Sequence, residues 1–323
     1  MDGMSTEDRE PNSNLGLARK PLPKNHHYVP RFYLAQFATA RAGEKAPGLW
    51  MFTRGQSSPK RIPPVQVARI HQYYAYPSHG AHDASPEMWF GKIETYAARI
   101  FDRFNQGEYE LTRDDKIAFS CFIGLMLIRI PADRLTVERG FASKFDQFKE
   151  RFPEQYRARM AEFAEDCGTF DENTLRQELI ASYSLTRVVR DLPKTVSVLM
   201  AHNWFIHKTA SRQGFVTSDR PALFHHRDKE NPLGYVSMPL SPTLHFTSRP
   251  QMGLMRRVRL THPHTEDELV ASLEDAEPRI RVGRAEPARI KLANQMILDH
   301  ALKYVFAASF DPSLGRAIMR KLG

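Results

Sequence analysis

Apolar residues recur at the helical spacing through most of the first 200 positions. Ser85 and Pro86 are typical of a helix start, and one stripe follows at the 3.6-residue period, made of Ile93, Ala97, Ile100, Phe101 and Phe104. Thr112 and Asp115 have the spacing of a capping box and predict a second helix, which Pro131 stops. This second helix is the most apolar element, so we expect it at the centre of the core.

Other helical segments are shorter or more polar. Pro30 suits the first turn of a short helix, on which Tyr33 and Phe37 share one face. A short helix is also expected from Gln66. Residues 133–182 are charged with a thin apolar stripe, which predicts a surface excursion of two helices separated by Gly168. A further helix is predicted at 193–202.

The pattern then changes to alternation, which is typical of strands. The predicted strands are short and divided by Gly, Pro and Asp, at 204–207, 214–217, 234–238 and 244–247. Short strands without intervening helices favour antiparallel pairing. An earlier strand at 49–53, helices near 265–276 and 287–300, and a last strand at 304–308 complete the prediction. The fold class is α+β, with a flexible leader at 1–24 and a single domain at 25–323.

Composition narrows the class of protein. The chain has 323 residues, 41% of them hydrophobic, and a formal net charge of +9, which is ordinary for a globular protein. No apolar run is long enough to span a bilayer, and the first ten residues lack the apolar region of a secretory signal. Two cysteines exclude a disulfide framework. We expect a soluble cytoplasmic protein without membrane contact. No glycine-rich nucleotide loop, HExxH or GxSxG motif is present.

Three residues are the candidate catalytic groups. His26 and His27 are adjacent, so in extended chain one faces the interior and the other faces outward or binds backbone. The interior imidazole is either an acid, base or ligand, or a buried group that ties the leader to the core. Asp219 ends an apolar strand just before Pro221. Its carboxylate either binds a metal, histidine or hydroxyl, or forms a turn with Ser218 and nearby amides.

Five residues are the candidate substrate-binding groups: Arg31, Glu94, Arg129, Ser218 and Asn294. A guanidinium matches phosphate or carboxylate oxygens, which suits Arg31 and Arg129 to an anion. Arg129 also ends an apolar helix, where a cation offsets the helix dipole. Glu94 is either paired with an arginine, for which Arg129 is the candidate, or an acid of raised pKa in a pocket. Asn294 fits a hydrogen bond from a helix to a loop.

Several local motifs carry a resemblance. They are His26-His27-Tyr28-Val29-Pro30, the helix end Arg129-Ile130-Pro131, and Thr217-Ser218-Asp219-Arg220-Pro221, with Pro239-Leu240-Ser241-Pro242 and Asn294 further on. In this order they resemble domain-of-unknown-function family 4238 over roughly residues 25–310. The resemblance implies a shared fold and site without naming a reaction. The chain departs from the family pattern in the charged stretch at 133–182 and at Arg220, where the family often has Asn.

Two classes of function follow from the candidate residues and the charge. The first is a hydrolase-like enzyme for a phosphate-bearing substrate or nucleic acid, with His as acid or base, Asp as orienting group or metal ligand, and Arg as oxyanion clamp. The second is a non-enzymatic module that binds nucleic acid or another polyanion, or a stress or toxin component that needs a partner. A divalent metal has no motif to support it, and no oligomeric state is indicated. The first class requires the amino-terminal histidines, Arg129 and Asp219 to share one cleft.

Overall fold

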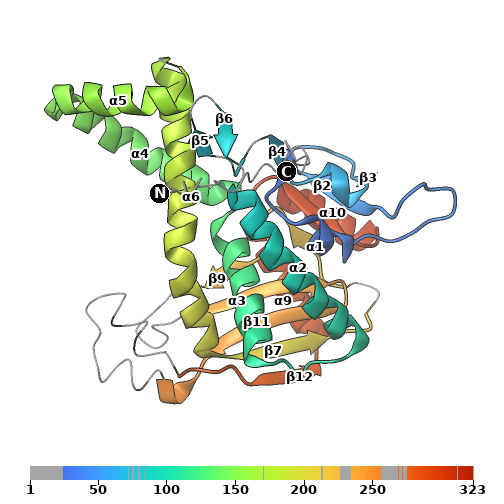
Figure 1. Ribbon diagram of the computed structural model, residues 1–323. Helices are drawn as coiled ribbons and strands as arrows, with labels where there is room; N and C mark the ends of the chain where they lie inside the picture. Colours follow the sequence, from blue (N-terminus) through green and yellow to red (C-terminus); the bar gives the residue numbers. More distant parts are fainter. Residues whose placement is uncertain are drawn as a thin grey trace, which may run out of the picture.

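The computed structural model describes residues 25–71, 73–74, 76–78, 81–83, 85–169, 171–211, 214–225, 234–254, 275–310 and 312–322, with positions 256, 268 and 271. This part of the chain is α+β, as the sequence predicts, with helices layered on small sheets (Figure 1). The predicted leader at 1–24 and most of the predicted helix at 265–276 lie outside the described residues.

Five strands form the larger sheet, in the order β12-β7-β11-β10-β9. Their bounds are β7 His202–Lys208, β9 Leu223–His225, β10 Tyr235–Ser241, β11 Leu244–Pro250 and β12 Ile280–Arg284. Three of them, β7, β10 and β11, contain predicted strands and pair antiparallel, as expected. β12 was not predicted, and it pairs parallel to β7, so the expectation of antiparallel pairing fails at this edge.

A second sheet joins distant parts of the chain, in the order β3-β2-β13-β8. Its strands are β2 Leu49–Thr53, β3 Lys60–Ile62, β8 Thr217–Ser218 and β13 Tyr304–Ala307. The predicted strand at 214–217 is therefore only two residues long and belongs to this sheet. Two small ribbons pair β1 Asn25–His27 with β4 Arg69–His71, and β5 Tyr76–Ser78 with β6 Ala81–Asp83.

Helices cover both faces of the larger sheet (Figure 1). The helices are α1 Arg31–Ala35, α2 Ser85–Gln106, α3 Arg113–Ile128, α4 Pro131–Arg151, α5 Pro153–Cys167, α6 Glu172–Met200, α9 Pro287–His300 and α10 Pro312–Leu322, with the 3₁₀ turn η1 Pro64–Gln66. Phe246 of β11 contacts Phe119 of α3 on one face. Its neighbour His245 points to the other face and stacks on Phe215, which packs against α9.

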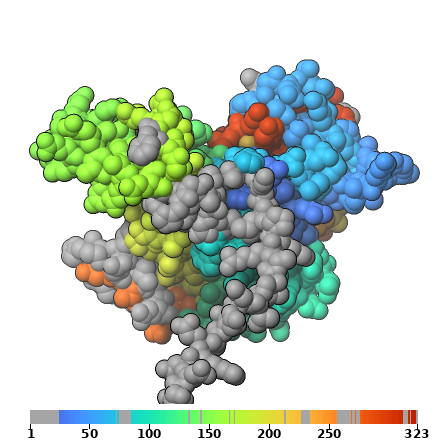
Figure 2. Space-filling model, turned by 45° about the horizontal axis from the view of Figure 1, so that its top comes forward, coloured from blue at the N-terminus to red at the C-terminus, as the bar shows by residue number. Residues whose placement is uncertain are grey.

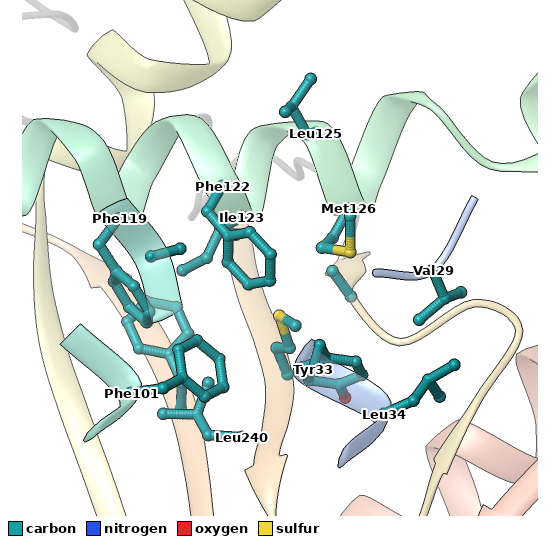
Figure 3. Close-up of a cluster of buried hydrophobic side chains, with 14 of the residues drawn as sticks. Val29, Tyr33, Leu34, Phe101, Phe119, Phe122, Ile123, Leu125, Met126 and Leu240 are labelled. Atoms are coloured by element: carbon teal, nitrogen blue, oxygen red, sulfur yellow. The ribbon is translucent and has the colours of Figure 1, made fainter. Parts of the chain in front are cut away.

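The predicted central helix, α3, is buried on more than one side. Thr112 and Asp115 form the capping box that the sequence predicts. In Figure 3, Phe122 and Met126 point toward Tyr33 of α1, whereas Leu125 points to the opposite side of the helix. A Cβ on Gly124 would lie 2.6 Å from a methyl carbon of Leu192, so glycine allows α6 to approach closely. No helix in the described part of the chain is long and apolar enough to cross a membrane.

The charged stretch at 133–182 forms most of α4, all of α5 and the beginning of α6. Helices α4 and α5, which meet at Phe152, stand out from the rest of the molecule, and we call them together the lobe, whereas Gly168 separates α5 from α6 (Figure 2). Gly168 ends α5 with a left-handed φ of 67°, a conformation that glycine adopts without strain. This confirms the prediction that Gly168 separates two helices. The following helix, α6, runs from the lobe along the rest of the molecule.

Two predicted helices are wrong in their extent. The helix expected from Gln66 is the 3₁₀ turn η1, which ends at Gln66, and β4 follows it. The helix expected to start at Pro193 is instead the last part of α6, with Pro193 inside the helix. Proline leaves the carbonyl of Val189 without its usual partner, and Val189 is 50% exposed, so water can replace that bond.

Candidate functional site

The candidate site lies between the first half of α2 and the end of α3. Glu87, Phe90 and Glu94 are spaced three and four residues apart on α2, so they share one face of the helix. Arg129, the residue that ends α3, faces them. The face and the arginine together bring two carboxylates and one guanidinium into one cluster, which we call the Arg129 cluster.

Arg129 is buried, with 2% of the residue exposed. Its Nη2 donates a hydrogen bond to Oε1 of Glu94, which confirms the predicted ion pair. The guanidinium carbon lies 5.5 Å from the ring centre of Tyr74 and 5.3 Å from that of Phe90. Burial alone would lower the pKa of Arg129, but the charge and hydrogen bond of Glu94, together with Tyr74 and the charge of Glu87, outweigh it and raise the pKa. Arg129 is therefore a permanent buried cation.

Two of the three guanidinium nitrogens make no hydrogen bond to a described residue. Nε and Nη1 of Arg129 are buried and have no hydrogen-bond partner among the residues that the structure describes. Buried donors nearly always find a partner, and a charged one is costly to leave without. The guanidinium lies over the rings of Tyr74 and Phe90, and the described residues supply no oxygen acceptor for these two nitrogens.

Glu87 has the most perturbed carboxyl group of the cluster. Burial raises its pKa to about 7, opposed by the charge of Arg129 and reinforced by that of Glu94. Its Oε2 is buried and has no partner within the described ranges. At neutral pH a large fraction of Glu87 is protonated, so it can give up or accept a proton there.

His26 and His27 approach the cluster from β1. His26 is 1% exposed and His27 is half-buried, so the two rings face different surroundings, as the sequence predicts. Nδ1 of His26 accepts the backbone N–H of Tyr74 at 2.9 Å, and the two rings stack in parallel. Tyr74 in turn donates its hydroxyl to the carbonyl of Arg129 at 2.8 Å. A chain of contacts thus joins β1 to the end of α3.

His27 is the candidate base. Burial lowers its pKa, while a hydrogen bond with the backbone at Val65 and the charge of Glu94 raise it, and Arg69 and Arg31 lower it. Its Nε2 is buried without a partner in the described part of the chain, so Nδ1 makes the bond to the backbone. With the proton held on Nδ1, the lone pair of Nε2 is free to accept another. Arg31, exposed at the start of α1, adds positive charge nearby.

Asp219 lies in a different setting. Its Oδ1 accepts the backbone N–H of Leu302 at 2.9 Å, and its Oδ2 accepts those of Lys303 at 2.7 Å and Tyr304 at 2.9 Å. Burial raises its pKa, and these three bonds oppose the rise. The carboxylate fixes the start of β13. Its charge raises the pKa of Tyr28, a neighbour of His27 in sequence, but the described residues include no hydrogen bond or ion pair that joins Asp219 to His27 or Arg129.

Ser218 and Asn294 also bind backbone. The hydroxyl of Ser218 accepts the N–H of Arg220 at 3.1 Å and donates to the carbonyl of the same residue at 3.0 Å. Asn294 of α9 accepts the N–H of Val216 at 3.0 Å and donates to the carbonyl of Gly214 at 3.1 Å. Both side chains shape the segment that leads through β8 to Asp219, and Asn294 makes the helix-to-loop bonds that the sequence indicates.

Two buried histidines, His202 and His245, and the half-buried His207 belong to the larger sheet rather than to the Arg129 cluster. Burial lowers the pKa of His202 and of His245 to about 3, and that of His207 to about 4. The positive charge of Arg289 on α9 contributes to the shift in His207 and His245. Each ring is therefore neutral at physiological pH. No group of three or more His, Cys, Asp or Glu side chains within the described ranges is arranged to hold a metal ion.

The sequence indicated Arg129, Glu94 and His27, but Glu87 was missed. Glu87 is seven residues before Glu94 on a predicted helix, and that spacing places both carboxylates on one face. This signal was available. Tyr74 was also missed as the residue that links His26 to Arg129, because its role depends on contacts across three separate segments.

The fold defines an α+β protein, and the Arg129 cluster places two carboxyl groups beside one buried guanidinium in its helical layer. A family model described as "Protein of unknown function (DUF4238)" matches residues 25–311. The chain belongs to this family, as the motifs in the sequence indicate. No curated protein and no solved structure matches the chain.

Proposed function

We propose that the protein is a hydrolase-type enzyme that cleaves a phosphate ester at the Arg129 cluster. One observation carries this proposal. A fully buried arginine keeps two nitrogens without hydrogen-bond partners among the described residues, beside a carboxyl group whose pKa is about 7. A purely structural ion pair gains nothing from leaving these groups unpaired, whereas a site for an anionic substrate needs them free.

Arg129 is the anion-binding group in this proposal. Its Nε and Nη1 present N–H groups on different sides of the guanidinium, so each can donate a hydrogen bond to an oxygen of an anion. Nη2 stays on Glu94, so the guanidinium is held in place before substrate arrives. Such a preorganised cation stabilises the negative charge that develops on the phosphoryl oxygens in the transition state.

His27 and Glu87 divide the proton transfers. Nε2 of His27 accepts a proton from the attacking water, and protonated Glu87 gives its proton to the oxygen of the leaving group. The P–O bond to the leaving group breaks as the bond to the water oxygen forms, so one water is consumed and an alcohol is released. The rate should fall above pH 7, because Glu87 then loses the proton that it must donate.

The proposal keeps His27, Arg129 and Glu94 from the sequence prediction and adds Glu87. It gives Asp219, Ser218 and Asn294 a supporting function, because each of them is occupied by backbone groups. Their predicted part in catalysis or substrate binding is not needed for the proton transfers at the Arg129 cluster. His26 acts as a positioning residue through Tyr74.

The test is hydrolysis of p-nitrophenyl phosphate, bis-p-nitrophenyl phosphate and a single-stranded oligonucleotide by the full chain and its variants. Glu87→Gln and His27→Ala should each lower kcat by about 10²- to 10⁴-fold, the usual contribution of a general acid or base. Glu165→Gln is the matched control, since Glu165 is exposed on α5, and it should be silent.

Arg129→Lys separates binding from stability. Lysine keeps the charge but loses the Nε and Nη1 donors of the guanidinium, so KM for the phosphate substrate should rise while circular dichroism shows an intact fold. Arg320→Lys, at an exposed position on α10, is its control. Absence of turnover on all three substrates, or equal turnover in Glu87→Gln and Glu165→Gln, would overturn the proposal. Salt-dependent oligonucleotide binding without turnover would favour the polyanion-binding alternative instead.

A further inference from the structure

The lobe contains an apolar cavity that lies apart from the Arg129 cluster. The cavity has a volume of about 490 Å³, is lined by residues of α4, α5 and α6, and is open to solvent on one side. Most of its wall is aromatic or aliphatic, formed by Phe141, Phe145, Phe148, Tyr156, Phe163 and Leu179. Cavities of this size with a mainly apolar wall are typical of small-molecule sites.

Ring packing and polar contacts hold the wall of the cavity. Phe145 and Tyr156 meet edge to face with ring centres 5.3 Å apart, and Phe141 lies 5.5 Å from Phe145. The hydroxyl of Tyr156 donates to Glu172 at 2.9 Å, which ties α5 to the start of α6. The three helices are thus joined around the cavity by specific contacts, so the space between them is a feature of the folded lobe.

Charge at the cavity points to the kind of ligand. Lys144 and Arg159 contribute two cations to the lining, against one acidic residue, Glu162, which pairs with Arg159 at 3.2 Å. Lys144 is exposed, and the structure gives it no ion pair among the described residues. Among the described residues, one positive charge therefore has no paired carboxylate beside the apolar wall.

We propose that this cavity binds an amphipathic small molecule with a hydrocarbon or aromatic body and one carboxylate. The body fills the aromatic interior, and the carboxylate meets Lys144 and Arg159. Both parts of the ligand contribute to binding. Burial of the body removes apolar surface from water, and the lysine ammonium pairs with the carboxylate at the rim of the cavity. The site is separate from the Arg129 cluster and does not depend on the proposed hydrolysis.

Isothermal titration of the full chain with decanoate tests the proposal. The wild-type protein should bind decanoate with saturation at one site per chain. Leu179→Trp places a larger side chain in the cavity and should weaken binding at least about tenfold, a loss of about 1.4 kcal/mol. A second filling variant, Met160→Trp, covers the case in which Leu179→Trp fails to fold.

The charge of the ligand is tested separately. Lys144→Glu combined with Arg159→Glu should weaken decanoate binding by about tenfold and leave binding of the neutral 1-decanol unchanged, because only the ionic contact is removed. Lys291→Glu on α9 is the matched control at an exposed position. Lack of saturable decanoate binding, or equal affinity in wild type and both filling variants, would overturn the proposal. Equal losses for decanoate and decanol would overturn the assignment of a carboxylate.

Discussion

Arg129 and Asp219 are both charged side chains with only 2% of the residue exposed, but their hydrogen bonding differs. The two oxygens of Asp219 accept three backbone N–H groups, all from residues 302–304. Arg129 uses one nitrogen on Glu94 and leaves two buried nitrogens without partners in the described part of the chain.

The difference separates a charge that holds the fold from one that can receive a ligand. A buried carboxylate with its hydrogen bonds satisfied locally stabilises the segments that it joins. A buried cation that is half satisfied has a free energy cost in the empty protein, and an anion would remove it. Substitution of buried charged groups, and measurement of stability at different pH values, test whether each group holds the fold or can receive a ligand.

Loss of the Asp219 carboxylate should have the largest effect. Asp219→Ala leaves three backbone N–H groups without their acceptor and should lower the free energy of unfolding by about 3 to 5 kcal/mol. Urea denaturation measures it. Asp219→Asn keeps one acceptor oxygen and should lose less. A fully stable Asp219→Ala protein that has lost its activity would return Asp219 to the catalytic site.

Buried histidines should make the protein sensitive to acid. His245 has its pKa lowered to about 3 by burial and by the charges of His207, Arg289 and His225. The unfolded chain takes up a proton below about pH 6.5 while the folded ring stays neutral, so stability is lost as the pH falls from 6.5 toward 3.

Between pH 6.5 and 4.5 the cost for His245 is about 2 kcal/mol. His245→Phe keeps the stacking on Phe215 and should flatten the dependence of unfolding free energy on pH in this window. His71→Phe, at an exposed position, should leave the slope unchanged. An equal slope of unfolding free energy against pH in His245→Phe and His71→Phe would show that the acid sensitivity arises from groups other than His245.

Glu87 should produce a smaller dependence of the opposite sign. Its folded pKa of about 7 is above the ordinary value of 4.5, so the unfolded chain releases its proton first as the pH rises. Stability is therefore lost between about pH 4.5 and 7, by about 2 kcal/mol after allowance for partial exposure.

Glu87→Gln removes this titration. The variant should match the wild type at pH 4 and be more stable at pH 8, as thermal or urea denaturation would show. Glu165→Gln should behave as the wild type at both values. A Glu87→Gln protein that is less stable than the wild type at pH 8 would mean that the carboxylate makes an attractive contact which outweighs the cost of its burial.

Local patterns in the sequence predict much of the fold. The capping box at Thr112 and Asp115, the turn at Gly168 and the strands β7, β10 and β11 all depend on neighbouring residues, so their signals lie in short segments. The helix start predicted at Pro193 was wrong. A helix tolerates an internal proline only where the carbonyl that loses its partner can bind water, and this depends on where that carbonyl points in the folded protein. β12 was missed because its place beside β7 is set by tertiary pairing.

The candidate site was predictable only where its residues have local signals in the sequence. Glu94 and Arg129 pair as expected, since one lies on an amphipathic helix and the other ends an apolar one. The perturbed pKa of Glu87 arises from burial by segments distant in sequence, which no local pattern records. For Asp219, the sequence suggested backbone amides of the nearby turn, whereas the acceptor sites are filled by residues 302–304.

Titration of Glu87 by carbon NMR, with and without inorganic phosphate, is the sharpest test of anion binding at the Arg129 cluster. The carboxyl signal is assigned by its absence in Glu87→Gln. We predict a pKa near 7 in the free protein, and a higher one with phosphate, because an anion bound to Arg129 disfavours a second negative charge beside it. In Arg129→Lys the response to phosphate should be lost. A pKa near 4.5 that phosphate does not change would contradict the assignment of the Arg129 cluster as an anion-binding site.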